Sequence, residues 1–283
     1  MTARMAGRGF GPVAAALRHL VLMAGAVIML SPFVWMLLSS FKPQSEILSA
    51  ELAFLPQRWA AIENYATVFT RVPMGRFLLN GVVVTVSIFA LQVLVNLPCA
   101  YALAKLRFRG RGTLFTVVLL GLLIPMHATA IPIYILFHHA GILNTYAALI
   151  LPFAISVFGI FMLRQFFMTV PDDLIDAARI DGISEFGIVW RIMLPTAMPA
   201  VTAFGIFSVV AHWNDYFWPL IAVGEQRFYT PPLGIAFLKL NGEGTAYGPL
   251  MAAATIVIAP LVLAFLLAQR RFVEGITFTG LKG

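Results

Sequence analysis

Long apolar segments alternate with shorter polar ones along this chain, and the pattern predicts an all-α integral membrane protein. About 20 consecutive apolar residues suffice to cross the hydrocarbon core of a bilayer as a helix. Six segments meet this requirement: residues 19–39, 78–104, 114–137, 146–168, 197–222 and 249–269. The third is expected to kink at Pro125 and Pro132, and the fifth is the weakest because it contains His212, Asn214 and Asp215.

Basic residues flank these segments unevenly, and this asymmetry predicts the orientation of the spans. With a cytoplasmic N-terminus, 13 of the 19 Lys and Arg residues lie on the cytoplasmic side, as the positive-inside rule requires. These are Arg4, Arg8, Arg18, Lys105, Arg107, Arg109, Arg111, Arg164, Arg179, Arg191, Arg270, Arg271 and Lys282. The strongest local signal is KLRFRGRG (105–112), which is expected to be a solvated loop touching anionic headgroups. Both chain ends and the loop 169–196 are therefore expected in the cytoplasm.

Composition supports the membrane class and excludes an ordinary soluble domain. Hydrophobic residues make up 60% of the 283 positions and charged residues 11%, whereas soluble domains carry about a quarter charged residues. The net charge of +7 does not indicate nucleic-acid binding, because the basic residues flank apolar runs.

The first apolar run is longer than a signal-peptide core of about 7–15 residues and no small-residue cleavage site follows it, so we interpret it as an uncleaved span. Cys99 is the single cysteine, so an intrachain disulfide is impossible.

Three connections are too long to be simple turns: residues 40–77 and 223–248, expected outside, and residues 169–196, expected inside. The first is expected to lie partly on the membrane surface. No internal repeat and no low-complexity linker divides the chain, so residues 1–283 are expected to form a single transmembrane domain.

The inner connection carries a charged, amphipathic pattern that predicts two short helices. Pro171 suits a first helical position, and Asp172 follows where the helix dipole favours negative charge. Gly182 is placed to end this helix in a left-handed conformation, Ser184 to cap a second one, and Pro195 to end it. One side of the first helix would hold Leu174, Ala177, Ala178 and Asp181, and one side of the second Phe186, Val189, Trp190 and Met193. The pattern alone fits helices that merely cover the bundle as well as a docking surface for a soluble partner.

The same segment resembles the cytoplasmic EAA loop of the permease subunits of bacterial ABC importers. That loop has Glu-Ala-Ala, three residues, Gly, nine variable residues and Ile-x-Leu-Pro. This chain has Asp176-Ala177-Ala178, then Gly182, and it ends the segment with Ile192-Met193-Leu194-Pro195. Asp176 replaces the usual Glu and is one methylene shorter, but it keeps the charge. PFVWMLLSSFKP (32–43), HWNDYFWPL (212–220) and FVEGITFTGLKG (272–283) resemble the carbohydrate-uptake branch, in particular the six-span partner of maltose-type heterodimeric permeases.

The resemblance implies a non-catalytic subunit in a bacterial inner membrane. It implies four kinds of partner: a second permease, an ATPase dimer, an external substrate-binding protein, and a sugar or related solute. Coupling helices within 171–195 would transmit ATP-driven motion from the ATPase subunits, which would hold the ATP and Mg²⁺. The coupling residues would be Asp176, Ala177, Ala178, Asp181, Gly182, Phe186, Leu194 and Pro195. Asn241, Gly242, Glu243 and Gly244 would contact the binding protein.

The chain itself shows neither a nucleotide motif nor a metal motif. Gly182 and Gly187 have the spacing of a P-loop, but Ile188 follows where that motif needs lysine. His138 and His139 form a pair without a Cys, Asp or Glu at ligand spacing, so we interpret them as solvated or interfacial. We expect no cofactor and no catalytic residue in this chain.

Asp215 is the most informative residue within the predicted spans, because an acidic group there usually faces a cavity or a partner. With Trp213, Asn214 and Trp218 it would line a translocation path, since aromatic faces stack on sugars and polar groups bind hydroxyls. The alternative places Asp215 near the outer interface, paired with His212 or another subunit, with the aromatic residues in an interfacial belt.

Two other classes of function compete with the importer hypothesis. An ion-driven secondary carrier usually shows paired repeats and several ionisable groups within the membrane, whereas this chain shows Asp215 and no repeat. A membrane enzyme or scaffold lacks support, because no cluster of catalytic residues is present. The sequence leaves the carried solute open among sugars, polyols and glycerol phosphates.

Overall fold

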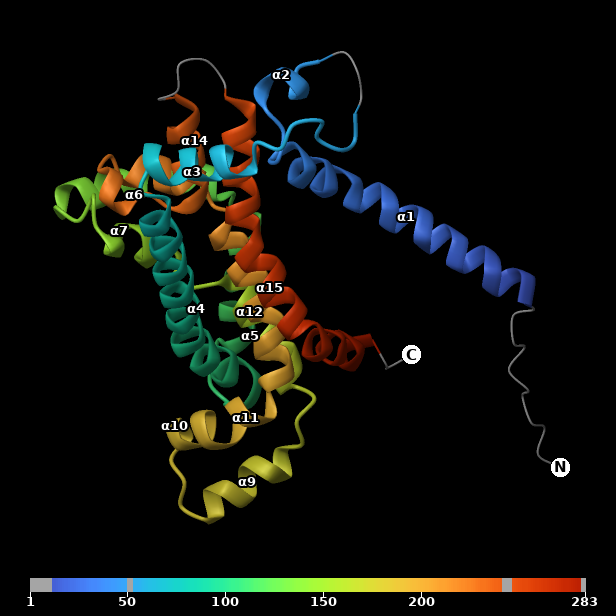
Figure 1. The fold of residues 1–283 in the computed structure, drawn as a ribbon. Coiled ribbons are helices and arrows are strands. Elements are labelled where there is room, and N and C mark those ends of the chain that lie inside the picture. The colour runs from blue at the N-terminus through green and yellow to red at the C-terminus, as the bar shows by residue number, and fades with distance from the viewer. Residues whose placement is uncertain (1–11, 50–52, 241–245, 281–283) are drawn as a thin grey trace. The chain divides into compact units, whose positions relative to one another are not determined.

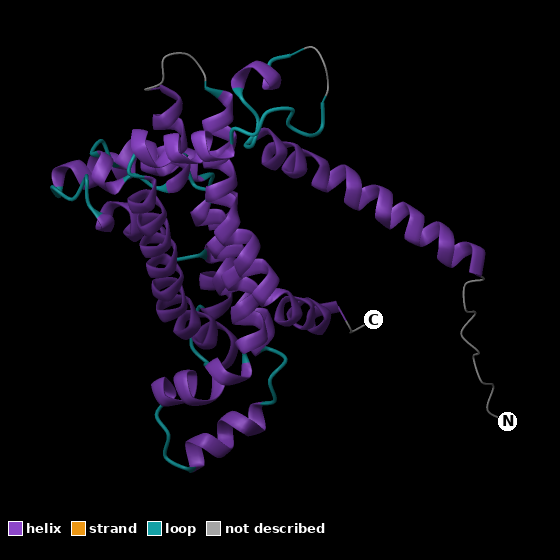
Figure 2. Ribbon diagram, viewed as in Figure 1, coloured by secondary structure: helices purple, strands orange, loops and turns teal. Residues whose placement is uncertain are grey.

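The computed structural model describes residues 12–49, 53–240 and 246–280, and every regular element within these ranges is a helix (Figures 1 and 2). Contacts divide the chain into two compact units: Met1–Thr70 with Gly242–Ile256, and Arg71–Asn241 with Val257–Gly283. The first unit contains α1 (Pro12–Ser39), α2 (Gln44–Ile47), α3 (Ala61–Arg71, except for its last residue) and the start of α15 (Tyr247–Gly280). The prediction of a single domain stays a prediction.

The second unit holds the other helices. They are α4 (Met74–Lys105), α5 (Arg111–Leu120), η1 (Gly121–Leu123), α6 (Met126–His139), α7 (Tyr146–Ile150), η2 (Leu151–Phe153), α8 (Val157–Phe167), α9 (Asp172–Ile180), α10 (Glu185–Ile188), η3 (Val189–Met193), α11 (Leu194–Thr196), α12 (Met198–Trp213), α13 (Phe217–Ala222), η4 (Gln226–Phe228), α14 (Pro231–Leu240) and the rest of α15. The η3 segment is a π-helix; η1, η2 and η4 are 3₁₀-helices.

Three described helices are long and apolar enough to cross a membrane alone: Val13–Ser39, Met74–Lys105 and Tyr247–Leu267. Three helix pairs meet the same criterion together but bend at a short break, so the described residues hold three candidate spans, or up to six if each pair is one span. The pairs are Arg111–Leu123 with Met126–His139 (97°), Tyr146–Phe153 with Val157–Phe167 (44°), and Glu185–Thr196 with Met198–Trp213 (81°). The first, second and sixth predicted segments thus correspond to unbroken helices, and the others lie in broken ones.

The breaks have local chemical causes. Ile124 precedes Pro125, takes an extended conformation, and ends the first half of the third segment there, whereas Pro132 lies inside α6. The predicted fifth segment, 197–222, is wrong as a continuous helix, because α12 ends at Trp213. There the Asn214 amide donates back to the Val210 carbonyl, and the Asp215 carboxylate accepts from the Trp218 amide at 3.3 Å. Such side chains compete with the helical hydrogen bonds.

The break in the fourth segment is closed by two buried amide side chains of α4. Gln92 Nε2 donates to the Phe153 carbonyl at 2.9 Å, and Asn96 Oδ1 accepts from the Ser156 amide at 3.2 Å. Backbone groups freed by a break in a span need such partners, because lipid offers none. Gln92 also accepts from the Ser208 hydroxyl of α12 at 2.6 Å, so this point joins three helices.

Within the first unit, polar side chains fix the connection that follows α1. Asn64 of α3 is buried and donates to the carbonyls of Ser40 and Lys42 at 2.8 and 2.9 Å. The Lys42 ammonium is also buried, where it donates to the Ala53 carbonyl and lies 4.8 Å from the centre of the Trp35 ring. This part of the predicted external connection is therefore an ordered structure.

In the second unit, α4 packs against α7, α8, α12 and α14. Buried apolar side chains form two clusters, one at each end of α4. One includes Val84, Ile88, Phe137, Trp218 and Leu233. The other lies where α4 meets α8 and the loop 169–196 and is described with that loop.

Candidate interaction surface on the loop 169–196

Residues 172–182 fold as a helix ended by a glycine, as the sequence predicts. Gly182 has φ +77°, and the Ile183 amide donates to the Ala178 carbonyl while the Gly182 amide donates to the Arg179 carbonyl, both at 3.0 Å. This pair of bonds is the Schellman arrangement, which satisfies the last carbonyls of a helix. Pro171 lies at the cap position, one residue before α9, rather than inside the helix.

The second helix begins where its predicted cap lies and continues further than predicted. The Ser184 hydroxyl accepts from the Gly187 amide at 3.2 Å and caps α10. The chain then widens into η3, in which the Leu194 amide bonds to the Val189 carbonyl five residues earlier. Pro195 does not end this helix; α11 runs to Thr196, and the chain turns by 81° before α12.

Two side chains of α4 hold this loop, one at the start of α9 and one at the start of α10. Lys105 Nζ donates at 2.6 Å both to the Val170 carbonyl and to the Asp172 carboxylate at the start of α9. One turn earlier, the buried Tyr101 hydroxyl donates to the Glu185 carboxylate at 2.5 Å. The hydrogen bond and positive charge of Lys105 lower the pKa of Asp172. The loop is therefore fixed to the end of α4 at two points (Figure 1).

Arg179 joins the two short helices to each other. Its Nε donates to Glu185 at 2.8 Å and one terminal nitrogen donates to Asp176 at 3.0 Å. The hydrogen bond with Glu185, followed by that with Asp176, raises the pKa of Arg179. The predicted coupling residue Asp176 therefore forms an ion pair within its own helix.

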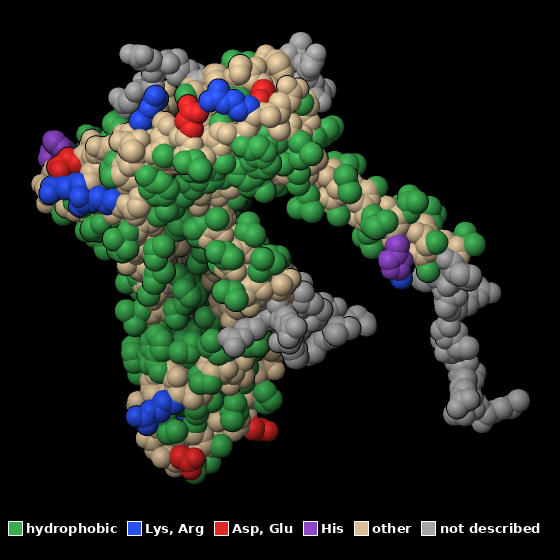
Figure 3. Space-filling view, in the orientation of Figure 1, with side chains coloured by type: hydrophobic (Ala, Val, Ile, Leu, Met, Phe, Trp, Pro, Cys, Tyr) green, Lys and Arg blue, Asp and Glu red, His purple; other side chains and the backbone are tan. Residues whose placement is uncertain are grey.

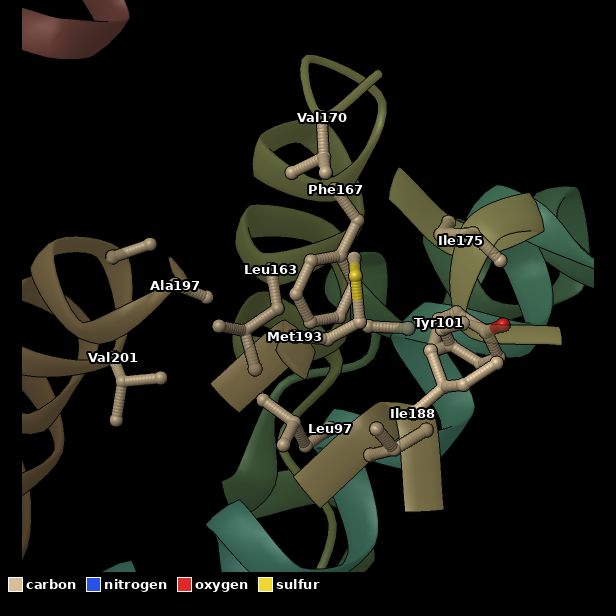
Figure 4. Packing of buried hydrophobic residues seen from close by; sticks show 14 residues of the cluster. Leu97, Tyr101, Leu163, Phe167, Val170, Ile175, Ile188, Met193, Ala197 and Val201 are labelled. Carbon is tan, nitrogen blue, oxygen red and sulfur yellow. The ribbon is translucent and has the colours of Figure 1, made fainter. Parts of the chain in front are cut away.

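The inner face of the loop belongs to the apolar core around the end of α4 (Figure 4). Ile175 and Ala178 of α9 and Ile188, Val189 and Met193 of the following turns are at most 4% exposed. They pack with Leu97, Tyr101, Leu163 and Phe167, and in Figure 4 the labelled side chains from α4, α8 and the loop converge on one another. The inner face of the loop is therefore packed directly onto α4 and α8.

The outer face of the loop remains apolar although it is exposed. Ile180 is 87% exposed, Phe186 66% and Leu174 43%. Ala177 and Asp181 lie exposed beside them. Leu174, Ala177, Ile180, Asp181 and Phe186 are called the outer loop face below. An exposed group of large apolar side chains next to charged ones is typical of a site for another protein.

The predicted coupling residues divide between the two faces. Asp176, Ala177, Asp181, Gly182, Phe186 and Pro195 are exposed, Leu194 is half-buried, and Ala178 is buried in the core. The close approach made by Ala178 is therefore to the chain's own core. Sequence reasoning gave no role to Tyr101 and Lys105, although their spacing of four residues at the end of a predicted span places them on one face of α4.

The residues predicted to line a translocation path are also divided. Trp213 and Trp218 are at most 4% exposed, and their indole nitrogens donate to the carbonyls of Val257 and Ala148 at 3.0 and 2.8 Å. Both indoles are thus packed in the core of the second unit, and their role in a path stays a prediction. Asn214 is exposed and Asp215 half-buried at the break between α12 and α13. The role of these two residues likewise stays a prediction.

Two other sets of residues were singled out from the sequence, the segment 241–244 and the pair His138 and His139. Asn241, Gly242, Glu243 and Gly244 lie outside the described residues. His138 and His139 end α6 with ring centres 5.9 Å apart. Among the described residues, no group of three or more His, Cys, Asp or Glu side chains could hold a metal ion.

Comparisons with known proteins agree on one family. The family model described as "Binding-protein-dependent transport system inner membrane component" matches residues 96–277. The chain is 34% identical to an arabinooligosaccharides transport system permease protein of Halalkalibacterium halodurans, over 91% of this chain and 93% of the relative. It is also 34% identical to a diacetylchitobiose uptake system permease protein of Streptomyces coelicolor, over 93% and 87%.

A solved structure supports the fold. The chain is similar to a chain in the crystal structure of a bacterial ABC transporter involved in the import of the acidic polysaccharide alginate. The TM-score is 0.78 at 21% identity, with 96% of this chain and 99% of the other covered.

Proposed function

The chain belongs to the binding-protein-dependent transport system inner membrane components, and from this premise we propose that it is a permease subunit of an ATP-driven sugar importer. Its relatives are permease proteins named for arabinooligosaccharides and diacetylchitobiose, and from these names we infer a saccharide or related solute. The comparisons give no support to an ion-driven secondary carrier.

In the proposed topology the chain crosses the membrane six times with both ends in the cytoplasm. Three spans are the unbroken helices, two are the bent pairs within 111–139 and 146–167, and one is the predicted segment 197–222, so that Glu185–Thr196 stays in the cytoplasmic loop. The distribution of basic residues supports this orientation. On the face drawn in Figure 3, side chains along α4 are mostly hydrophobic, and charged ones lie near both of its ends. One of these ends carries α9 and α10. This end would be cytoplasmic.

The loop 169–196 acts as the coupling element in this proposal. The observation that carries it is the contrast between an exposed apolar outer loop face and an inner face fixed to α4. An ATPase subunit would bind the outer loop face and push it when the ATPase dimer closes around ATP. Because Lys105 and Tyr101 tie the loop to α4, and apolar packing ties it to α8, the push would move both helices together.

The rest of the assembly follows from the family. A second permease would complete the translocation path, and Asn214 and Asp215 are the candidates in this chain for contact with the solute. The segment 241–244 would reach the external binding protein. ATP and Mg²⁺ would be held by the partner ATPase subunits, since this sequence lacks the lysine of a P-loop.

The docking proposal is tested by placing a negative charge on the outer loop face. We would purify the complex through this chain with Ile180→Glu or Phe186→Glu and measure the ATPase recovered with it. Burial of one such side chain stabilises a complex by about 1.5–3 kcal/mol, so each variant should weaken ATPase binding about tenfold or more.

Leu55→Glu is the matched control, because Leu55 is 69% exposed in the predicted external connection. It should retain the ATPase fully. Recovery that is unchanged in both loop variants, with the complex still intact, would show that the outer loop face is not the docking surface.

A further inference from the structure

A cluster of basic side chains lies where α4 ends and α5 begins. Arg107, Arg109 and Arg111 follow one another at alternate positions, and Arg164 joins them from α8. We call these four residues the basic cluster. Among the side chains that the structure describes, no carboxylate forms an ion pair with any of the four, whereas their neighbour Lys105 is paired with Asp172. Arg107 lines a polar pocket together with Asp172 and Asp176 without forming an ion pair with either, so the cluster keeps a net positive charge.

Two members of the basic cluster are fixed in place by the end of α4. Arg164 Nε donates to the Leu103 carbonyl at 3.1 Å, and its guanidinium lies 3.8 Å from the centre of the Phe115 ring. One terminal nitrogen of Arg111 donates to the Leu106 carbonyl at 3.1 Å. Each guanidinium has five N–H donors, so both arginines keep donors for a further acceptor. The guanidinium groups of Arg111 and Arg164 are thus held in position near each other, and each keeps N–H groups that can donate to a further acceptor.

The surroundings of the basic cluster correspond to the surface of a membrane. The linker between α4 and α5 covers only residues 106–110, and it joins two apolar helical segments. Phe108, between Arg107 and Arg109, is 42% exposed, and Leu114 in the first turn of α5 is 49% exposed. Exposed apolar side chains interleaved with arginines suit the boundary between headgroups and acyl chains, where both kinds of group are satisfied.

We propose that the basic cluster binds the headgroup phosphate of an anionic phospholipid in the cytoplasmic leaflet. The inference rests on the proposed function only for the orientation of the loop 105–112. Guanidinium groups suit phosphate because their donors match its oxygens, and basic pockets at cytoplasmic helix ends favour anionic headgroups. Arg111 and Arg164 would bind the phosphate, Arg107 and Arg109 would add attraction, and Phe108 and Leu114 would contact the acyl chains.

The test compares lipid binding by the purified importer complex. Native mass spectrometry would follow titration with dioleoyl phosphatidylglycerol and, separately, with dioleoyl phosphatidylcholine. The variant Arg107→Gln/Arg109→Gln leaves the hydrogen bonds of the other two arginines intact. The matched control is Arg71→Gln/Arg76→Gln, which removes the same charge from exposed side chains on the predicted external side.

We expect the wild-type complex to bind phosphatidylglycerol at least tenfold more tightly than phosphatidylcholine. Arg107→Gln/Arg109→Gln should weaken phosphatidylglycerol binding about 30-fold, at about fivefold for each guanidinium removed, and leave phosphatidylcholine unchanged. The control should bind as wild type. Equal affinity of the wild type for the two lipids, or an undiminished preference in the variant, would overturn the proposal.

Two further measurements separate this proposal from its neighbours. Displacement of the lipid by millimolar inorganic phosphate would assign the cluster to a free phosphate and overturn the lipid assignment. Loss of ATPase from Arg107→Gln/Arg109→Gln with lipid preference retained would assign the cluster to the ATPase and likewise overturn it. Failure of the wild-type chain to recover any ATPase would instead contradict the proposed function, and it leaves the lipid titration interpretable on the chain alone.

Discussion

Substitution of Gly182 tests whether a single backbone conformation holds together the two helical halves of the loop 169–196, α9 and α10. Its φ of +77° lies in the left-handed region, and a Cβ atom added there would meet no atom within 4 Å. Gly182→Ala therefore adds no steric clash, and its whole cost is conformational.

The size of this effect follows from the geometry. A non-glycine residue in the left-handed region costs about 1–2 kcal/mol, which lowers the population of the closed loop relative to its open forms about 5- to 30-fold. Gly182→Asn should cost less, because Asn tolerates this region. Gly182→Pro should cost about 3 kcal/mol or more, because proline fixes φ near −65° and lacks the N–H that donates to the Arg179 carbonyl.

Amide hydrogen exchange measures this population directly, because a locally opened segment exchanges in proportion to its opening free energy. Exchange over residues 178–188 should quicken 5- to 30-fold in Gly182→Ala, less in the Asn variant and more in the Pro variant. Gly75→Ala is the control: Gly75 is helical, has no positive φ and also has no atom within 4 Å of an added Cβ. Wild-type exchange in Gly182→Ala would refute the reasoning, as would an equal increase in Gly75→Ala.

Three further predictions concern contacts within each unit. Tyr101→Phe removes the hydrogen bond to the half-exposed Glu185, so exchange over residues 185–193 should quicken about fivefold, and an unchanged rate would contradict the proposed anchor. The lowered pKa of Asp172 means that its bond to Lys105 is intact above the ordinary carboxyl pKa near 3.9 and is lost as pH falls through the lower folded-state value. Exchange at residues 172–175, corrected for intrinsic rates, should therefore be constant from pH 7 to 5 and quicken below about pH 4, and Asp172→Asn should abolish this dependence. Gly248→Ala would place a Cβ 2.6 Å from the buried Asn64 amide oxygen, so it should cost about 1–3 kcal/mol and lower the Tm by several degrees; an unchanged Tm would refute that packing.

The helix ends within the loop 169–196 were predictable because their chemistry is local. A proline, acidic residues in a first turn, a glycine at a helix end and a serine cap act on backbone groups within a few residues. The structure accordingly places Gly182 and Ser184 where the sequence predicts them. Pro195 misled the prediction, because the chain passes it by widening into a π-helix.

Features that depend on distant partners were not predictable from spacing. The hydrogen bonds of Trp213 and Trp218 are one case: their indole nitrogens donate to carbonyl groups 44 and 70 residues away in the sequence. Pro152 in η2 lies just before the break in the fourth span, but the amide side chains that bond to the freed backbone groups lie about 60 residues earlier in α4. A pattern of residue types carries no information on which of several buried polar groups will meet.

Under the proposed function, the polar contacts of α4 would carry motion of the loop 169–196 to the helix breaks. At its end Tyr101 and Lys105 hold the loop, and Gln92, about two turns earlier, joins the break in the fourth span to α12. Between them, Leu97 and Ala100 pack in the same core as the loop. A close-packed core transmits displacement rather than absorbing it. A push on the loop would therefore act on the helix breaks, which are the parts of the second unit that can change angle without losing a long run of backbone hydrogen bonds.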